Sequence, residues 1–300
     1  MNLSCIVCAS DGSDHSRTVL ASAVALAKWE DAELHIVQLA DPASERNGPS
    51  PAVRERSTTV VREGDPAAAV IDHARSVRAD LIVVGSTLPA SATDRSGRLA
   101  EVIARDAPCP TLIVPLLTMQ RLDELPFRNV LCPVDFSPNS VVAYERALAL
   151  TERAGGTLTL LHVVDEFRDL SGDVRILAAD ELQLRVAEGR ARLGLAISEA
   201  PLDWCHVGFH VSAGAADVHT LAEARRLGAD LIVMGLTSRA NTALPTRLSS
   251  LVGRVAAQAT CPVLVVRAAP GAPGWDQAYD VSERRAPINP AELSSIGAPQ

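Results

Sequence analysis

The chain has 300 residues, of which 47% are hydrophobic and only 3% aromatic, and its formal net charge is −8 at pH 7. Single hydrophobic cores rarely grow beyond about 250 to 300 residues, so this length favours two domains. The composition favours aliphatic cores of the kind found in buried parallel sheets. The negative charge, without any run of Lys and Arg, argues against nucleic acid as a partner.

The sequence enters a strand-like run directly, without a basic segment followed by an apolar leader. No stretch reaches the roughly 18 consecutive apolar residues that suggest a membrane span. We therefore expect a cytoplasmic protein that does not contact a membrane. In that reducing compartment, the six cysteines are expected to be packed thiols.

An internal repeat is the strongest pattern in the sequence. IVCASDGS, at residues 6–13, matches VLCPVDFS, at residues 130–137, so Asp11 aligns with Asp135 at an offset of 124. ADLIVVG and ADLIVMG, which end at Gly85 and Gly235, match at an offset of 150. Repeat two therefore carries an insertion of 26 residues, the difference between the two offsets. Each repeat alternates β-branched runs with helical periodicity, which predicts βαβ units around a parallel sheet.

Five strands are predicted in each repeat. Those of repeat one lie near residues 3–9, 33–40, 57–62, 80–85 and 111–115. Those of repeat two lie near residues 128–134, 156–163, 203–211, 230–235 and 262–267. The inserted residues 174–197 have apolar side chains at helical spacing and predict an additional helix. The corresponding residues 41–56 of repeat one contain three prolines and predict a loop.

These elements predict one domain over residues 1–118, a second over residues 128–268 and a flexible C-terminal tail over residues 269–300. The tail is rich in Pro and Gly and offers few apolar positions, so truncation after Val266 is predicted to leave the fold intact. We expect the fifth strands of the two repeats to meet edge to edge, because this pairing covers the unpaired backbone groups of both.

The order of these motifs, found twice between residues 3 and 267, resembles the universal stress protein family. The resemblance implies an α/β fold of two tandem doubly wound domains, each a five-stranded parallel sheet with strand order 3-2-1-4-5 flanked by helices. It also implies an intrachain pseudo-dimer of the two domains. It leaves open a homo-oligomer and an unidentified protein partner.

The resemblance also implies where a ligand would bind. In ATP-binding members, a glycine-rich loop after the fourth strand holds the phosphates, and an aspartate after the first strand contacts the adenine end. The candidate ligand is therefore ATP or another adenine nucleotide. The positions of this sequence that match the site are Asp11, Gly85, Gly97 and Arg98 in repeat one and Asp135, Gly235, Ser238, Ser249 and Ser250 in repeat two.

Both loops depart from the family pattern of Gly, two residues, Gly, nine residues, and Gly followed by Ser or Thr. Leu88 replaces the second glycine of repeat one, and Gly97 comes one position early. Serines replace the later glycines of repeat two, where Ser249 and Ser250 come one position late. A side chain either clashes or moves the loop where backbone must approach phosphate closely. We therefore predict a noncatalytic stress-response or signalling module; the alternative is an ATP-binding member with slow ATP hydrolysis or phosphotransfer.

The other candidate groups have structural interpretations. The two aspartates precede predicted helices, where a carboxylate also caps backbone N–H groups. Cys5 and Cys8 form CxxC, but within a strand they point to opposite faces. No fourth ligand at the spacing of a metal site accompanies Cys205, His206 and His210. We expect neither a metal site nor a catalytic group.

Overall fold

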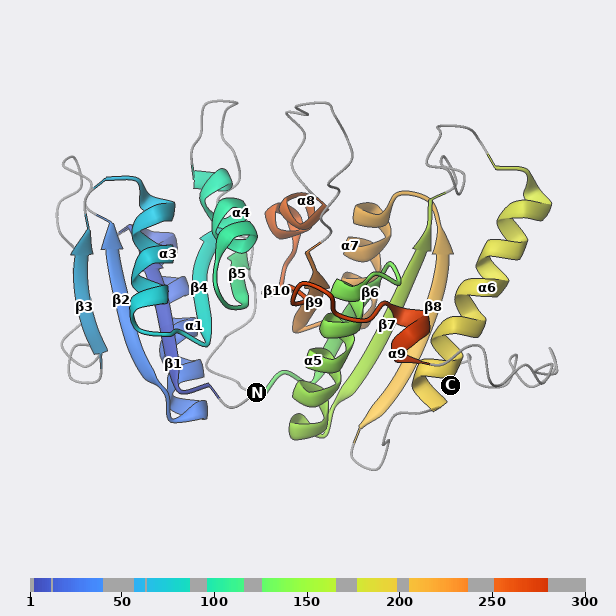
Figure 1. The fold of residues 1–300 in the computed structure, drawn as a ribbon, viewed down its shortest axis with the longest axis horizontal. Coiled ribbons are helices and arrows are strands. Elements are labelled where there is room, and N and C mark those ends of the chain that lie inside the picture. Colours follow the sequence, from blue (N-terminus) through green and yellow to red (C-terminus); the bar gives the residue numbers. More distant parts are fainter. Residues whose placement is uncertain are drawn as a thin grey trace. The chain divides into compact units, whose positions relative to one another are not determined.

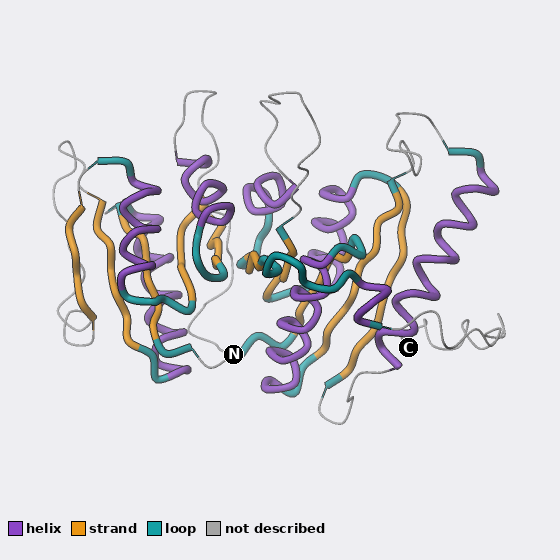
Figure 2. Tube along the Cα trace, in the orientation of Figure 1, coloured by secondary structure: helices purple, strands orange, loops and turns teal. Residues whose placement is uncertain are grey.

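The computed structural model describes residues 3–11, 13–39, 57–62, 64–86, 96–115, 126–165, 177–198, 205–236 and 251–279. These residues form alternating strands and helices (Figures 1 and 2). They group into two compact units, of which unit 1 comprises Met1–Pro126 with Ser238–Arg267 and unit 2 comprises Phe127–Thr237 with Ala268–Gln300. The last helix and strand of the second sequence repeat therefore belong to unit 1.

The described residues of unit 1 form six strands, β1 (Cys5–Ser10), β2 (Glu33–Leu39), β3 (Ser57–Arg62), β4 (Leu81–Ser86), β5 (Thr111–Pro115) and β10 (Val263–Val266). Its helices are α1 (Asp14–Glu30), α3 (Pro66–Ser76), α4 (Ser96–Asp106) and α8 (Leu251–Gln258). The strand order is β3-β2-β1-β4-β5-β10. The first five strands are parallel, which confirms the order 3-2-1-4-5 for repeat one. β10 pairs with β5 antiparallel, which confirms the predicted pairing of the two fifth strands.

In the part of unit 2 that the structure describes there are four strands, β6 (Asn129–Val134), β7 (Thr157–Val164), β8 (His206–Ala213) and β9 (Leu231–Gly235). Its helices are α5 (Pro138–Ala154), α6 (Ala179–Ser198), α7 (Ala216–Leu227) and α9 (Trp275–Ala278). The strands are parallel in the order β9-β6-β7-β8, which is the order of the first four strands of a doubly wound repeat. α6 is the helix predicted from the insertion. The largest error in a predicted strand start is at β8, which begins at His206 rather than at residue 203.

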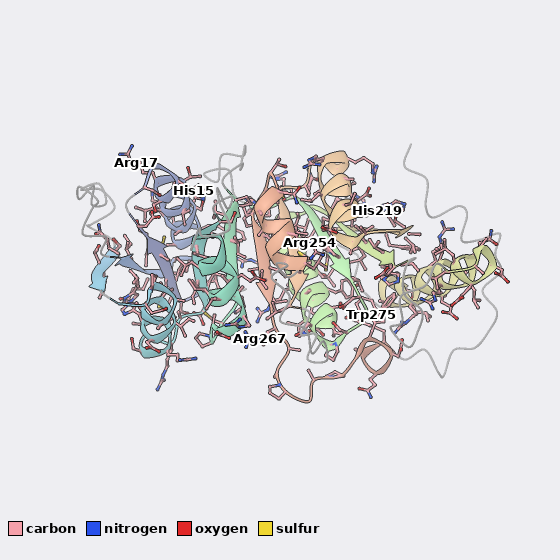
Figure 3. All side chains as sticks on the ribbon, turned by 90° about the horizontal axis from the view of Figure 1, so that it is seen from above. His15, Arg17, His219, Arg254, Arg267 and Trp275 are labelled. Carbon is pink, nitrogen blue, oxygen red and sulfur yellow. The ribbon has the colours of Figure 1, made fainter. Side chains whose placement is uncertain are left out.

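Helices cover both faces of each sheet. In unit 1, α3 packs beside α4, and α1 lies on the opposite face, marked by His15 and Arg17 in Figure 3. In unit 2, α5 and α9 share one face, whereas α7 lies on the other, as Trp275 and His219 show in Figure 3. The core between these layers is largely aliphatic, with Ile6, Ile82 and Leu131 fully buried. Among the helices that the structure describes, none is long and apolar enough to cross a membrane.

The aspartates of the two ADLIV motifs hold the amino ends of neighbouring strands together. Oδ2 of Asp80 accepts hydrogen bonds from the N–H groups of Ser4 and Cys5, at 2.7 and 3.0 Å. Oδ2 of Asp230 makes the same pair of contacts at the start of β6, at 2.6 and 3.0 Å. These contacts between neighbouring strands therefore explain why both motifs contain an aspartate at this position.

The first part of the predicted C-terminal tail contains the short helix α9. α9 brings Trp275 to 0% exposure, packed against Tyr144 with ring centroids 5.7 Å apart. This part of the predicted tail therefore contributes one buried aromatic residue to unit 2, and a large aromatic side chain buries more apolar surface than several small residues. Residues 280–300 of the predicted tail lie outside the described residues.

Candidate functional site

The loop after β1 is organised around the carboxylate of Asp11. Ser13 donates its N–H to Oδ1 of Asp11 at 3.0 Å, and the hydroxyl of Ser16 donates a short hydrogen bond to the same oxygen. The N–H of Asp11 donates in return to the Ser16 hydroxyl at 3.1 Å. Ser13 is also the N-cap of α1, since its side chain accepts the N–H of Ser16. The three residues form a closed turn that starts the helix.

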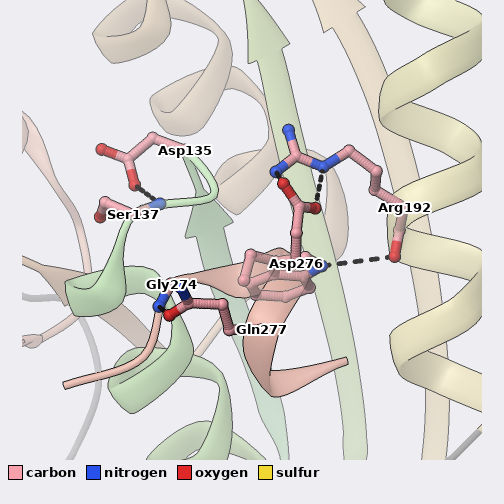
Figure 4. A network of polar contacts seen from close by, with 7 residues as sticks. Asp135, Ser137, Arg192, Gly274, Asp276 and Gln277 are labelled. Atoms are coloured by element: carbon pink, nitrogen blue, oxygen red, sulfur yellow. Dashed lines mark hydrogen bonds and ion pairs between the residues drawn. The ribbon is translucent and has the colours of Figure 1, made fainter. Parts of the chain in front are cut away.

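The loop after β6 repeats this turn in the second unit. Ser137 donates its N–H to Oδ1 of Asp135 at 3.1 Å, as drawn in Figure 4. The hydroxyl of Ser140 donates to the same oxygen and accepts the N–H of Asp135 at 2.9 Å. Ser137 caps α5 as Ser13 caps α1. We call these two structures the Asp11 turn and the Asp135 turn.

Both aspartates are exposed at the carboxyl ends of their strands. Desolvation by the surrounding loop raises the pKa of Asp11, but the hydrogen bonds from Ser16 and Ser13 together outweigh this effect and leave the pKa below its usual value. A carboxylate stabilised in its charged form is a poor proton donor near neutral pH. The chemistry of the Asp11 turn therefore favours an anchor or a hydrogen-bond acceptor.

Each aspartate lies near one of the predicted loop glycines. β1 pairs with β4, and β6 pairs with β9. Asp11 and Asp135 directly follow β1 and β6, whereas Gly85 and Gly235 lie in the carboxyl-terminal ends of the neighbouring parallel strands β4 and β9. The carboxyl ends of such strands are where doubly wound folds bind ligands. In each unit, the fold therefore brings the aspartate and the glycine predicted from the sequence to the same edge of the sheet.

The two glycines make room for the helix that follows each aspartate. A Cβ on Gly85 would lie 2.9 Å from ring atoms of His15, and a Cβ on Gly235 would lie 2.6 Å from the backbone of Asn139. His15 and Asn139 occupy equivalent positions in the repeats, 124 residues apart. Nε2 of His15 lies 3.2 Å from the carbonyl oxygen of Val114. Close helix packing is therefore a sufficient reason for glycine at both positions.

The remaining predicted site residues are only partly described. Gly97 and Arg98 lie in the first turn of α4, and their side chains are not among the described ones. Leu88 lies outside the described residues, as do the three serines predicted for repeat two, Ser238, Ser249 and Ser250. In the sequence, Ser249 and Ser250 directly precede α8.

An aromatic and cationic cluster next to the Asp135 turn was not predicted. Phe136 has φ +63°, a left-handed conformation that costs a bulky residue about 1 to 3 kcal/mol. The guanidinium carbon of Arg192 lies 3.9 Å from the centroid of its ring, and the rings of His162 and Trp275 lie at 4.3 and 5.5 Å. One sequence signal was available, because the residue of repeat one that aligns with Phe136 is Gly12.

The histidine and cysteine candidates have structural surroundings. Nδ1 of His162 donates to the carbonyl oxygen of Val134 at 2.8 Å, and burial lowers the pKa of this histidine. Burial raises the pKa of the Cys8 thiol to about 12 and also raises that of Cys132. All six cysteines are free thiols. Within the described ranges, no group of three His, Cys, Asp or Glu side chains is arranged to hold a metal ion.

Solved structures with this fold include a universal stress protein from Archaeoglobus fulgidus, with a TM-score of 0.63 and 19% identity, covering 89% of this chain and 97% of that one. A functionally unknown protein from Pseudomonas aeruginosa PAO1 matches with a TM-score of 0.59 and 19% identity, over 89% of this chain and 93% of that one. At this identity, the likeness shows the fold alone. No curated protein matches the chain.

The sequence profile of the Universal stress protein family matches the chain twice, over residues 50–115 and 126–267. The two matches together cover more than half of the chain and fall in its two repeats. The chain therefore belongs to the universal stress protein family and carries two tandem domains of that family.

Proposed function

We propose that this chain is a noncatalytic stress-response or signalling module. The observation that carries the proposal is the turn built twice, in which Asp11 and Asp135 each hold a serine hydroxyl and a backbone N–H of their own loop. A general acid or base must instead direct its carboxylate at a substrate proton. The two carboxylates support helix starts, which suits a module that acts through its conformation.

The loop glycines support the same proposal. Gly85 and Gly235 face α1 and α5 closely enough that a Cβ would collide with them. Close packing against these helices therefore explains the two glycines without a role in binding phosphate. With Leu88 and the serines at the other loop positions, the phosphate loops keep few of the features through which backbone N–H groups hold an anion.

The alternative is an ATP-binding protein with slow ATP hydrolysis or phosphotransfer. One observation favours it: both aspartates are exposed at the carboxyl edge of a parallel sheet, where this type of fold binds nucleotides. Each carboxylate receives its described hydrogen bonds at Oδ1. In this alternative, the turn aspartates would contact the nucleoside.

Calorimetric titration with ATP and magnesium separates the two proposals. We expect no saturable binding to repeat one at micromolar concentration and at most weak binding to repeat two. Two missing charge-assisted hydrogen bonds to phosphate, at about 1.5 to 3 kcal/mol each, weaken binding by roughly a hundredfold or more. Tight binding that Asp11→Ala abolishes would overturn the proposal for repeat one, and Asp135→Ala provides the matched test for repeat two.

A restoring variant tests the reason for weak binding. Ser238→Gly combined with Ser249→Gly returns glycine to the loop of repeat two, and affinity for ATP should rise if backbone approach is what the loop lacks. Leu88→Gly in repeat one is the matched variant. Unchanged affinity in both would assign the loss to loop length instead.

We also propose that the two repeats act as an intrachain pseudo-dimer that binds a further protein. The antiparallel pairing of β5 with β10 supports the pseudo-dimer, because it joins the last strands of the two repeats. Such pairing covers a strand edge that would otherwise be open.

A further inference from the structure

The C-terminal segment of unit 2, residues 268–279, is fixed at several points, and we call it the strap. At its start, the N–H of Ala268 donates to Oδ1 of Asn139 in the first turn of α5, at 2.7 Å. Near its end, Nε1 of the buried Trp275 donates to the carbonyl oxygen of Arg192 at 3.4 Å. Asp276 accepts two hydrogen bonds from the guanidinium of Arg192, at 2.8 and 2.7 Å (Figure 4).

Arg192 joins the strap to the Asp135 turn. Its guanidinium binds Asp276 in a bidentate pair and at the same time lies over the ring of Phe136. The bidentate pair fixes the plane of the guanidinium, and a fixed plane is what stacking on an aromatic ring requires. Loss of the Asp276 carboxylate would therefore loosen the contact between Arg192 and Phe136.

Phe136 occupies a backbone conformation that its own side chain disfavours. Such conformations persist only while the surroundings hold them. Here the surroundings are the rings of His162 and Trp275 and the guanidinium of Arg192, and two of these three depend on the strap. Phe136 stands directly between Asp135 and Ser137, whose N–H closes the turn on the carboxylate. Relaxation of Phe136 would move that N–H away.

We propose that the strap is a conformational device that holds the Asp135 turn closed through Arg192 and Phe136, and that its release opens the turn. Repeat one provides the contrast, since the Asp11 turn has the same hydrogen bonds and glycine in place of Phe136. A ligand or protein that bound the open Asp135 turn would favour release of the strap, and one that bound the released strap would favour opening of the turn. The coupling free energy is the same in both directions. This coupling rests on the proposed signalling function, but the closing action of the strap does not.

Amide hydrogen exchange of the full chain, without nucleotide, tests the closing action. Asp276→Ala removes the bidentate pair, and Asp276→Asn removes its charge with little change of shape. We expect exchange at the N–H groups of Ser137 and Ser140 to rise about tenfold in Asp276→Ala, and less in Asp276→Asn. Exchange at Ser13 and Ser16 in the Asp11 turn should stay unchanged.

Two controls separate this action from general stabilisation. Asp106→Ala breaks another bidentate Arg–Asp pair, with Arg105 in unit 1, and should leave both turns unchanged. In a Phe136→Gly background, Asp276→Ala should have no further effect on Ser137, because the strained residue is gone.

Exchange at Ser137 within twofold of the original chain in Asp276→Ala would overturn the proposal. So would a uniform rise over all of unit 2, or an undiminished effect of Asp276→Ala in the Phe136→Gly background. Each of these exchange measurements is independent of ATP binding. If calorimetry contradicted the proposed function, the exchange results alone would still decide the strap proposal.

Discussion

At the scale of single residues, the charge state of Asp11 links the turn to pH. Its pKa lies below the usual value of 3.8, so the hydrogen bonds of the turn stabilise the ionised form. A group with a lowered pKa in the folded state contributes stability above its unfolded pKa, and this contribution is lost as pH falls through the folded pKa. Asp11 should therefore stabilise unit 1 at neutral pH and cease to do so in acid.

We expect Asp11→Ala to lower the free energy of unfolding by about 1 kcal/mol at pH 7, a modest value because the carboxylate is exposed. The difference from the original chain should shrink once pH falls below about 4. Urea unfolding measured at several pH values checks this. Asp72→Ala, which removes an exposed ion pair with Arg75, is the control and should have little effect at any pH. An Asp11→Ala effect that grows in acid would contradict the assignment.

The loop glycines give a second prediction at this scale, because the two repeats differ in what each glycine faces. A Cβ on Gly235 would meet backbone atoms of Asn139, which cannot move without shifting α5, whereas a Cβ on Gly85 meets the ring of His15 and a methyl group of Val19. We expect Gly235→Ala to destabilise its unit by about 2 to 3 kcal/mol and Gly85→Ala by less.

Urea unfolding of the two variants measures the difference. Gly208→Ala, on β8, is the matched control, because a Cβ there meets nothing within 4 Å. Equal losses for Gly85→Ala and Gly235→Ala would show that contact with helix backbone is not the decisive feature.

The sequence predicted the turn aspartates and glycines, but not their surroundings. Asp11 and Asp135 could be found because a strand, an aspartate and a helix recur at a constant offset. The cluster around Phe136 could not, since it gathers Arg192 and Trp275 from positions 56 and 139 residues further along the chain. Contacts at such separations leave no local periodicity in the sequence. Only the replacement of Gly12 by Phe136 hinted at an unusual backbone conformation.

At the scale of elements, buried parallel strands were predictable because each is a continuous β-branched or aliphatic run bounded by turn residues. β4 and β9, for example, read LIVVGS and LIVMG and are almost wholly buried. α6 was predictable from helical spacing within the insertion. α9 was not, because four residues after a Pro- and Gly-rich stretch are too short to show a period.

At the scale of the whole molecule, division by sequence repeat and division by packing give different units. β10 ends the second repeat, yet it pairs with β5 and belongs to unit 1, while the residues that follow it return to unit 2. β10 belongs to unit 1 because the unpaired N–H and C=O groups along the edge of a strand form hydrogen bonds with any partner strand that is available. The segment after β10 therefore contributes the buried Trp275 to unit 2, although this segment lies outside the sequence repeat.

Truncation at the end of unit 1 tests this division. Removal of all residues after Arg267 takes away Trp275, which is fully buried, together with the ion pair between Asp276 and Arg192. Loss of a buried Trp side chain costs about 3 to 5 kcal/mol, a range that includes the cavity left beside Tyr144 and Phe136. We expect this loss to fall on unit 2, while the core of unit 1, including β10, keeps its stability.

Denaturant-dependent hydrogen exchange, followed separately for peptides of β1 and β6, measures the two units in the same sample. The matched control is truncation after Tyr279, which removes residues 280–300 and retains Trp275. In the chain truncated after Arg267, β6 should exchange at lower denaturant concentration than in the control, and β1 should be unchanged. If β6 keeps its stability within about 1 kcal/mol, the buried Trp275 is dispensable and the tail is an appendage, as its composition alone had suggested.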